Sequence, residues 1–144
     1  MVAAKKTSKK KVIVTSGKRK RAIARAYIKE GSGNVLVNGR PISLYFPNYA
    51  YLRALEPLVI AGDNLVSKVD VEVNVIGGGV TGQIDAVRQA IARGLVEYFD
   101  DEDLEKRYLA YDMSLIVFDP RRTEPHKPSR SKQGPRRKKQ LSKR

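Results

Sequence analysis

Cysteine and tryptophan are absent from this chain of 144 residues, and histidine occurs once. Without cysteine the chain forms no disulfide framework and no thiolate metal site, and a single histidine excludes a histidine-rich metal cluster. No apolar run approaches the roughly 20 residues that cross a bilayer. The N-terminal sequence MVAAKKTSKKK lacks the apolar segment of a secretory signal. We therefore expect a cytoplasmic protein of one domain with extensions and without a membrane partner.

Acidic residues are nearly absent from the two ends of the chain, although the whole chain carries 15 of them against 29 lysines and arginines. Residues 1–25 contain ten basic residues and no acid, and residues 119–144 contain eleven basic residues and two acids. The stretch between them has 13 acids and eight basic residues. A same-sign segment with little apolar content does not fold alone, and phosphates attract it by releasing counterions. The sequence thus predicts a nucleic-acid partner, ahead of an acidic protein or a membrane surface.

The C-terminal segment favours RNA over DNA. It has four prolines and a single large apolar residue, Leu141, so it cannot form the amphipathic helix that binds a membrane surface or the helix that reads a major groove. It suits an extended thread between the phosphates of a folded RNA. We therefore divide the chain into a disordered basic N-terminal arm (1–11), a globular α+β RNA-binding body (12–118) and an extended basic tail (119–144).

Hydrophobic periodicity predicts the elements of the body. Strands are expected at residues 12–15, 22–29, 35–37 and 69–76, with a break at Ser16 and Gly17. Asn38 and Gly39 predict a hairpin turn, with a strand or extended segment returning over residues 40–44. Helices are expected at residues 49–61, 82–99 and 101–111. This order predicts an α+β layer with the helices packed on one face of the sheet.

Each of the two longer helices shows an apolar stripe along one face. The stripe of the helix at 49–61 consists of Leu52, Leu55, Val59 and Ile60. The stripe of the helix at 82–99 consists of Ile84, Val87, Ile91 and Leu95. Arg88 and Arg93 lie off this second stripe, and we therefore count both among the side chains that could contact RNA.

Gly77, Gly79 and Gly82 satisfy the pattern G-x-G-x-x-G between a strand and a helix, which is typical of a dinucleotide-binding turn. The preceding strand alternates apolar and polar residues, whereas a dinucleotide-binding strand is buried on both faces. The acid expected on the ribose falls at a helix start, in residues 100–103, rather than at the end of a second strand. A dinucleotide-binding enzyme is therefore the weaker interpretation. The backbone N–H groups of such a turn also suit an RNA phosphate, unless the glycines only permit close packing.

The remaining candidates for chemistry are isolated. His126 has no carboxylate or serine constellation around it, and the acids of residues 100–105 are typical of a helix N-terminus rather than of a divalent cation site. Tyr45, Tyr49 and Tyr51 flank a proline-containing loop and are weak candidates for stacking on bases. We expect no catalytic residue, no metal site and no cofactor.

Several segments of the chain together resemble one family: GKRKRAIARAYI with VNGRPI, GGGVTGQIDAVRQAIARGL, DPRRTE and the terminal SKR. The resemblance is to the small-subunit ribosomal protein S-nine family. It runs from about Val12 to Arg144 and is most specific over residues 77–95. The segments LEPLVIAG and DPRRTEPHKPSR are more similar to archaeal or eukaryotic members than to bacterial ones, and the archaeal type fits best.

The resemblance implies a structural component of the small-subunit head, and not an enzyme. It implies a four-stranded mixed sheet with helices on one face, like the second domain of ribosomal protein S-five, and a left-handed β-α-β crossover against the usual rule. The partners that it implies are the 3′ head domain of the small-subunit ribosomal RNA, neighbouring head proteins and, through the tail, the peptidyl-site transfer RNA during translation. A free RNA-annealing protein is the other alternative.

The residues and the resemblance together give the expected contacts. The transfer RNA contacts are at the tip of the tail: Ser142, Lys143 and Arg144. The ribosomal RNA contacts are Lys18, Arg19, Lys20, Arg21, Arg25, Gly78, Gly79, Gln83, Arg88, Arg93, Arg121, Arg122, Arg130, Lys132, Arg136, Arg137, Lys138 and Lys139.

Overall fold

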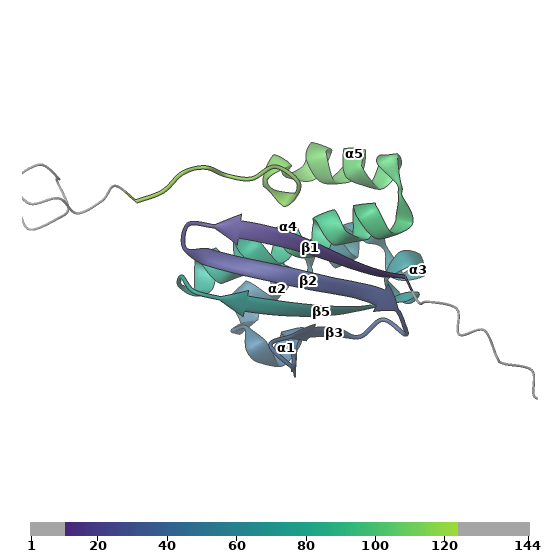
Figure 1. The fold of residues 1–144 in the computed structure, drawn as a ribbon, viewed down its shortest axis with the longest axis horizontal. Coiled ribbons are helices and arrows are strands. Elements are labelled where there is room, and N and C mark those ends of the chain that lie inside the picture. The colour runs from purple at the N-terminus through teal and green to yellow at the C-terminus, as the bar shows by residue number, and fades with distance from the viewer. Residues whose placement is uncertain (1–10, 124–144) are drawn as a thin grey trace, which may run out of the picture.

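The computed structural model describes residues 11–123 (Figure 1). The strands are β1 (Val12–Arg19), β2 (Ala22–Glu30), β3 (Val35–Val37), β4 (Arg40–Pro41) and β5 (Val69–Ile76). The helices are α1 (Ile42–Tyr45), α2 (Asn48–Ala61), α3 (Asp63–Val66), α4 (Val80–Phe99) and α5 (Glu102–Tyr111), followed by the 3₁₀ turn η1 (Met113–Leu115). The predicted N-terminal arm up to residue 10 and the tail from residue 124 lie outside the described residues. None of the described helices is long and apolar enough to cross a membrane.

The strands form one mixed sheet in the order β1-β2-β5-β3-β4. Neighbouring strands pair antiparallel except β3 and β5, which run parallel. The α+β class and the mixed sheet are confirmed, but the described sheet has five strands where four were expected. The fifth, β4, follows the predicted hairpin turn, in which Asn38 and Gly39 have φ of +49° and +75°. The expected extended return over residues 40–44 is wrong beyond Pro41, because α1 begins directly after this proline, which cannot donate to a strand ladder.

Strand β1 is continuous through Ser16 and Gly17, so the predicted break there is wrong. A Cβ atom on Gly17 would lie 2.1 Å from the carbonyl oxygen of Ala86 and 2.7 Å from the backbone nitrogen of Ala90. The hydroxyl of Thr15 also donates to the carbonyl oxygen of Ala90, at 2.8 Å. Glycine is therefore needed at position 17 because β1 crosses helix α4 at backbone contact, and not because the strand turns.

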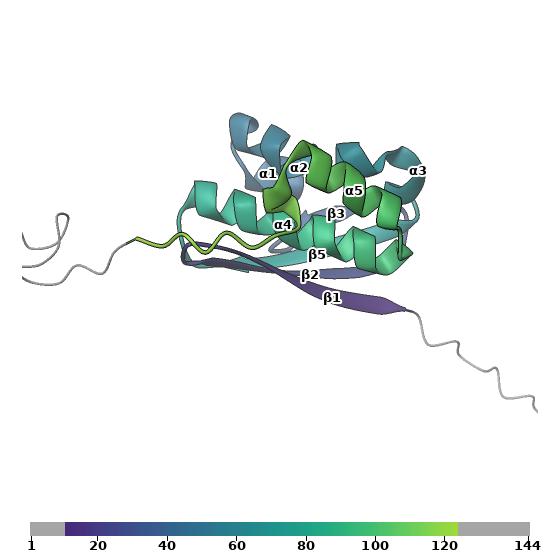
Figure 2. The same cartoon turned by 90° about the horizontal axis from the view of Figure 1, so that it is seen from above.

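The described helices cover one face of the sheet and leave the other face open (Figure 2). The covered face consists of alternate residues of β2 and β5: Ala22, Ala24, Ala26, Ile28, Val69, Val71, Val73 and Val75. The predicted apolar stripe of α4 lies in the same core. Tyr108 of α5 also lies in this core. Its hydroxyl donates to the carbonyl oxygen of Pro57 at 2.7 Å, and burial raises the pKa of this hydroxyl.

The connection between the parallel strands β3 and β5 runs through α1, α2 and α3, which lie behind the sheet in the view of Figure 1. In that view both strands run to the left, and β5 lies above β3. A path that leaves β3, passes behind the sheet and returns at β5 is therefore left-handed. The expected exception to the right-handed crossover preference is present in this fold.

Helix α2 presents a different face to the core from the one predicted. Leu52 and Val59 of the predicted stripe are 67% and 73% exposed. The buried residues of the helix are Ala50, Ala54, Pro57, Leu58 and Ala61. Three of these are alanines, whose small side chains let α2 pack closely against α4. The predicted stripe was chosen from the most hydrophobic residues of the helix, whereas the contact between α2 and α4 requires small side chains. The helix ends at Ala61 as predicted, and Gly62 follows it with φ of +86°.

Candidate nucleic-acid interface

Three connecting segments meet at one end of the sheet, at the left of Figure 1: the β1–β2 turn, the β5–α4 turn and the segment that follows η1. The first two are in contact. A Cβ atom on Gly77 would lie 2.7 Å from the carbonyl oxygen of Arg21, and one on Gly78 would lie 2.9 Å from the backbone nitrogen of Ala22. The third is fastened to β1 by an ion pair between Arg19 and Asp119. This end therefore brings together the basic hairpin, the glycine turn and the start of the tail.

The glycine turn contains two packed positions and one open position. Gly77 and Gly78 have φ of +73° and +69° and touch the β1–β2 turn, so packing accounts for both glycines. Gly79 has φ of −107° and nothing within 4 Å of its Cβ position, so packing does not account for it. Gly79 is the N-cap of α4 and offers no side chain to the first N–H groups of that helix. The side chain of Gln83 donates to the carbonyl oxygen of Gly77 at 3.1 Å and holds the turn.

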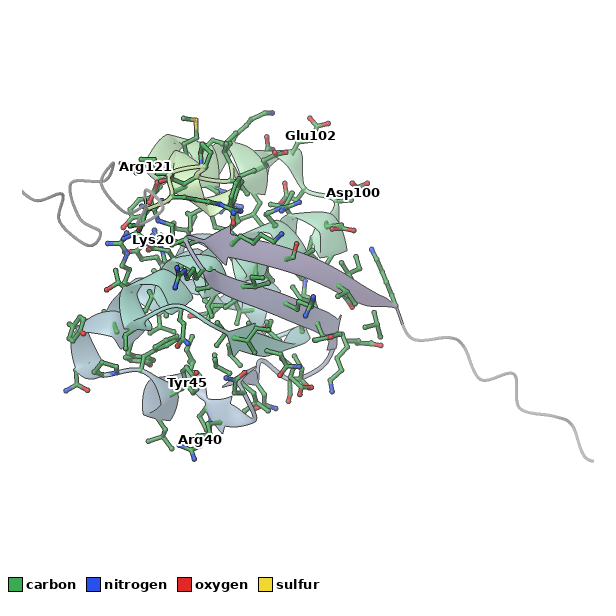
Figure 3. The ribbon with its side chains drawn as sticks, turned by 60° about the vertical axis from the view of Figure 1, so that its left-hand side comes forward. Lys20, Arg40, Tyr45, Asp100, Glu102 and Arg121 are labelled. Atoms are coloured by element: carbon green, nitrogen blue, oxygen red, sulfur yellow. The ribbon has the colours of Figure 1, made fainter. Side chains whose placement is uncertain are left out.

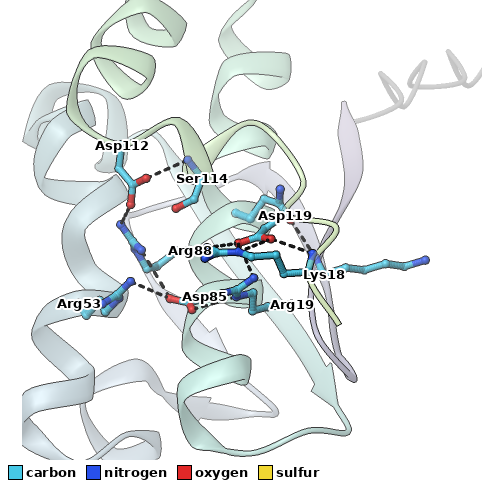
Figure 4. Close-up of polar contacts among 10 residues, drawn as sticks. Lys18, Arg19, Arg53, Asp85, Arg88, Asp112, Ser114 and Asp119 are labelled. Carbon is cyan, nitrogen blue, oxygen red and sulfur yellow. Dashed lines mark hydrogen bonds and ion pairs between the residues drawn. The ribbon is translucent and has the colours of Figure 1, made fainter. Parts of the chain in front are cut away.

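Arg88 is not on the surface, contrary to its place among the predicted RNA contacts. Its side chain is 2% exposed and pairs with Glu56, with Asp85 at 3.6 Å and with Asp112 at 3.1 Å (Figure 4). Burial raises the pKa of Asp112, but hydrogen bonds from Ser114 and Arg88 outweigh burial and hold that pKa below its usual range. The face of α4 beside its apolar stripe packs against α2 and η1 and is not exposed to solvent. We therefore remove Arg88 from the candidate contacts.

Arg19 and Arg121 are also bound to carboxylates. Arg19 pairs with Asp119 and lies 3.6 Å from Asp85, which Arg53 approaches to 3.1 Å (Figure 4). Arg121 donates to Asp119 through Nε at 3.0 Å and through Nη2 at 2.6 Å. Hydrogen bonds from the side chain and backbone of Arg121 hold the pKa of Asp119 far below its usual range. Asp119 thus fixes the segment that leads into the tail against strand β1.

Six predicted contacts have no carboxylate within ion-pair distance among the residues that the structure describes: Lys18, Lys20, Arg21, Arg25, Arg93 and Arg122. All six are exposed. Arg25 lies on the open face of the sheet, between Ser16 of β1 and Asn74 of β5. Because these cations lack an internal counter-charge, they are the side chains most available to an external polyanion.

Acidic residues gather at the other end of the body (Figure 3). In that view Lys20 and Arg121 lie at one side, and Asp100 and Glu102 lie at the other. Asp101 is the N-cap of α5 and accepts hydrogen bonds from two backbone N–H groups of its first turn. The acids therefore serve the helix start as predicted, and they lie away from Lys20 and Arg121.

No motif or periodicity in the sequence singles out Phe118 or Arg53. Phe118 is 41% exposed and lines the same hollow as Arg122. Its position depends on how the chain folds back along α4, which no local pattern records. Of the three tyrosines considered for stacking, Tyr45 and Tyr51 pack against the core, whereas Tyr49 is 72% exposed.

His126 and the nine predicted contacts beyond it lie outside the described residues: Arg130, Lys132, Arg136, Arg137, Lys138, Lys139, Ser142, Lys143 and Arg144. The geometry above therefore concerns the basic end of the body and the first residues of the tail.

A family model described as "Ribosomal protein S9/S16" matches residues 17–144. The chain belongs to this ribosomal protein family. Two relatives, each named "Small ribosomal subunit protein uS9" and each from a strain of the archaeon Methanococcus maripaludis, are 48% identical to it over 132 residues. The alignments cover 92% of this chain and 98% of each relative. The resemblance to an archaeal-type member of the S9 family is confirmed.

Membership of this family rules out the dinucleotide-enzyme interpretation of the glycine turn, because the family consists of ribosomal proteins and not of enzymes. The fold agrees with this. Strand β5 lies between an antiparallel and a parallel neighbour and is covered by described helices on one face only, whereas a dinucleotide-binding strand lies in a parallel sheet covered on both faces.

Proposed function

We propose that this S9-family protein is a structural constituent of the small-subunit head of the cytoplasmic ribosome and that it binds small-subunit ribosomal RNA. Two relatives are named as small ribosomal subunit proteins. The observation that carries the RNA contact is the group of six exposed cations without a carboxylate partner in the described part of the chain. Ion pairs and RNA phosphates compete for the same side chains, so cations without ion pairs are the ones that bind RNA without first losing a partner.

The contact surface on the body is the basic end of the sheet. Lys18, Lys20, Arg21, Arg93 and Arg122 bind phosphates, and Arg25 extends the surface onto the open face of the sheet. Gly79 leaves space for a phosphate to approach the N-terminus of α4, where backbone N–H groups and the helix dipole favour an anion. Gly78 and Gln83 shape this turn. Arg19 and Arg121 hold Asp119, and through it the start of the tail, in place.

The tail extends the same contact over the RNA. Arg130, Lys132 and residues 136–139 follow the ribosomal RNA, and residues 142–144 reach the peptidyl-site transfer RNA. The RNA partner is the 3′ head domain, and neighbouring head proteins complete the site. Contacts to phosphates carry no sequence information, so the tail tip holds different transfer RNAs alike.

The body contact is tested by binding the full chain to a transcript of the 3′ domain of small-subunit ribosomal RNA. The double variant Lys20→Gln with Arg21→Gln loses two phosphate contacts, and its affinity is expected to fall about tenfold or more. The matched control is Lys106→Gln with Arg107→Gln on α5, which removes the same charge near the acidic end. An equal loss in the control would contradict the proposed surface.

The tail contact is tested by deleting residues 142–144 and measuring transfer RNA affinity on purified small subunits. Loss of two charge-assisted contacts is expected to weaken peptidyl-site binding by about 1–3 kcal/mol while subunit assembly stays intact. Unchanged affinity for several transfer RNAs at low salt would exclude the tail-tip contact and leave the ribosomal RNA contact standing.

A further inference from the structure

Two hollows lie side by side at the basic end of the body and share Lys18 and Gln89 in their walls. The first is lined by the carboxylates of Asp85, Asp112 and Asp119 and by three arginines that pair with Asp85 or Asp119, namely Arg19, Arg53 and Arg121. Its arginines are paired with carboxylates of the protein, so they are less available to an external anion. It is the hollow of the ion-pair network shown in Figure 4.

The second hollow has the opposite character. Its volume is about 290 Å³, and its wall consists of Ser16, Lys18, Gln89, Arg93, Phe118 and Arg122. Three of these side chains are cations, none is a carboxylate, and one is an aromatic ring that is 41% exposed. This volume lies at the lower end of the range for small-ligand pockets, a size that suits one nucleotide.

The positions of the cations are held by the fold. Nη1 of Arg93 donates to the carbonyl oxygen of Ser16 at 3.0 Å, which directs the guanidinium along the edge of β1. The backbone nitrogen of Lys18 donates to Oε1 of Gln89 at 2.9 Å, and Gln89 is 3% exposed, so the base of the lysine is fixed. Arg122 and Phe118 come from the segment that Asp119 fastens to Arg19. Three distant parts of the chain therefore converge on one hollow.

We propose that this hollow binds one unpaired nucleotide of the ribosomal RNA. Its phosphate lies among Lys18, Arg93 and Arg122, and its base stacks on the ring of Phe118. Cations alone would suit any phosphate, but a partly exposed aromatic ring beside them suits an unstacked base. This site rests on the proposed ribosomal RNA binding and deepens it, since it specifies a single-stranded position as the partner of this part of the body.

The first test is ultraviolet crosslinking of the full chain bound to the 3′-domain transcript, followed by mass spectrometry of the nucleotide adducts. The expected result is an adduct on Phe118. Adducts on other residues of the body with none on Phe118 would overturn the site while leaving the proposed RNA binding in place. No binding of the transcript by the parent chain would overturn both.

The second test is the affinity of Phe118→Leu, which keeps an apolar side chain but removes the stacking surface. The RNA affinity of this variant is expected to fall about tenfold. The control is Tyr111→Leu, which removes an exposed aromatic ring at the end of α5 and is expected to leave the RNA affinity unchanged. Thermal unfolding of each variant establishes that it is folded at the assay temperature. Equal affinity of Phe118→Leu and the parent chain would overturn the stacking contact.

The third test concerns the phosphate. Arg93→Gln is expected to reduce the slope of log K against log salt by about one, and Arg107→Gln, the matched control on α5, leaves the slope unchanged. Competition with a nucleoside monophosphate distinguishes a site for a free nucleotide from a site for a nucleotide within an RNA chain. Weak or no competition is expected, because the site binds a nucleotide as part of a chain, and full displacement of the RNA would overturn this assignment.

Discussion

Carboxylate partners decide which arginines of this fold are available to RNA. Arg88 and Arg93 both lie on α4 and both lie off its apolar stripe, so sequence spacing treats them alike. In the structure Arg88 is buried against Glu56 and Asp112, whereas Arg93 is exposed and donates to a backbone carbonyl oxygen. The difference comes from α2 and η1, which cover one side of α4 and not the other. Spacing along one helix could not have predicted it.

Arg88→Met is therefore expected to act on stability and not on RNA affinity. Removing the guanidinium leaves three carboxylates close together without their common cation, which is expected to lower the free energy of unfolding by about 3 kcal/mol. Urea denaturation measures this loss. Arg53→Met, at a residue with a half-exposed side chain on the same network, should cost less than about 1 kcal/mol. A stable Arg88→Met protein with reduced RNA affinity would contradict this assignment.

The glycine turn gives a second prediction at the scale of single residues. Gly78→Ala places a Cβ atom 2.9 Å from Ala22 at a φ of +69°, so it is expected to lower the free energy of unfolding by about 2 kcal/mol. Gly79→Ser places its side chain in open space at the N-cap of α4, and stability should stay within about 0.5 kcal/mol. Thermal unfolding compares the two. Equal effects would contradict the distinction between a packed and an open glycine.

At the scale of elements, the contact between β1 and α4 sets the geometry of the basic end. Gly17→Ala is expected to cost about 3 kcal/mol, because its Cβ atom meets the backbone of Ala86 and Ala90 and the strand has to move off the helix. Ser16→Ala, on the open face of the same strand, is the control and should change stability by less than about 0.5 kcal/mol. Chemical denaturation tests both, and a mild effect of Gly17→Ala would show that β1 is free to shift.

The turn between β2 and β3 predicts a pH dependence. Hydrogen bonds from the backbone N–H groups of Ser32 and Asn34 hold the pKa of Asp70 below its ordinary value. A carboxylate whose pKa is lowered by folding stabilises the fold above the unfolded pKa of about 3.9, and this stability is lost as the pH falls through the folded pKa.

Asp70→Asn keeps an acceptor oxygen in this turn but cannot titrate. Its unfolding midpoint should therefore lie below that of the parent chain at pH 7, and the difference should shrink as the pH approaches 3. Thermal unfolding at the two pH values measures it. A difference between the two proteins that stays constant with pH would contradict the role of the Asp70 carboxylate.

The elements show where sequence reasoning works for this fold. The strict alternation in β5 and the four-residue apolar stripe of α4 predicted buried faces correctly, because each reflects a periodicity within one element. The stripe of α2 and the break in β1 were predicted wrongly, because alanine and glycine there serve contacts with another element. The left-handed crossover followed only from the family resemblance, since no local pattern encodes a connection that breaks the general rule.

At the scale of the whole molecule, the described body has a basic end beside the tail and acidic residues at its other end (Figure 3). This arrangement is expected to orient the protein on a polyanion, since the acidic residues would be repelled as the basic end is attracted. The composition of the two basic ends of the chain was enough to predict a nucleic-acid partner. It could not predict that Arg19 and Arg88 are neutralised inside the protein, because Asp119, Glu56 and Asp112 lie far from them along the chain. Arg121 pairs with Asp119 only two residues away, and no pattern in the sequence predicted that pair.

The most direct measurement of the central claim is the salt dependence of binding between the full chain and the 3′-domain transcript. If about ten basic side chains of the body and tail meet phosphates, log K should fall with log salt with a slope of about −7 to −9. Lys20→Gln with Arg21→Gln should make the slope shallower by about two. A slope near −2 for the parent chain would contradict the account, because it would mean that most of these cations stay in water when the RNA binds.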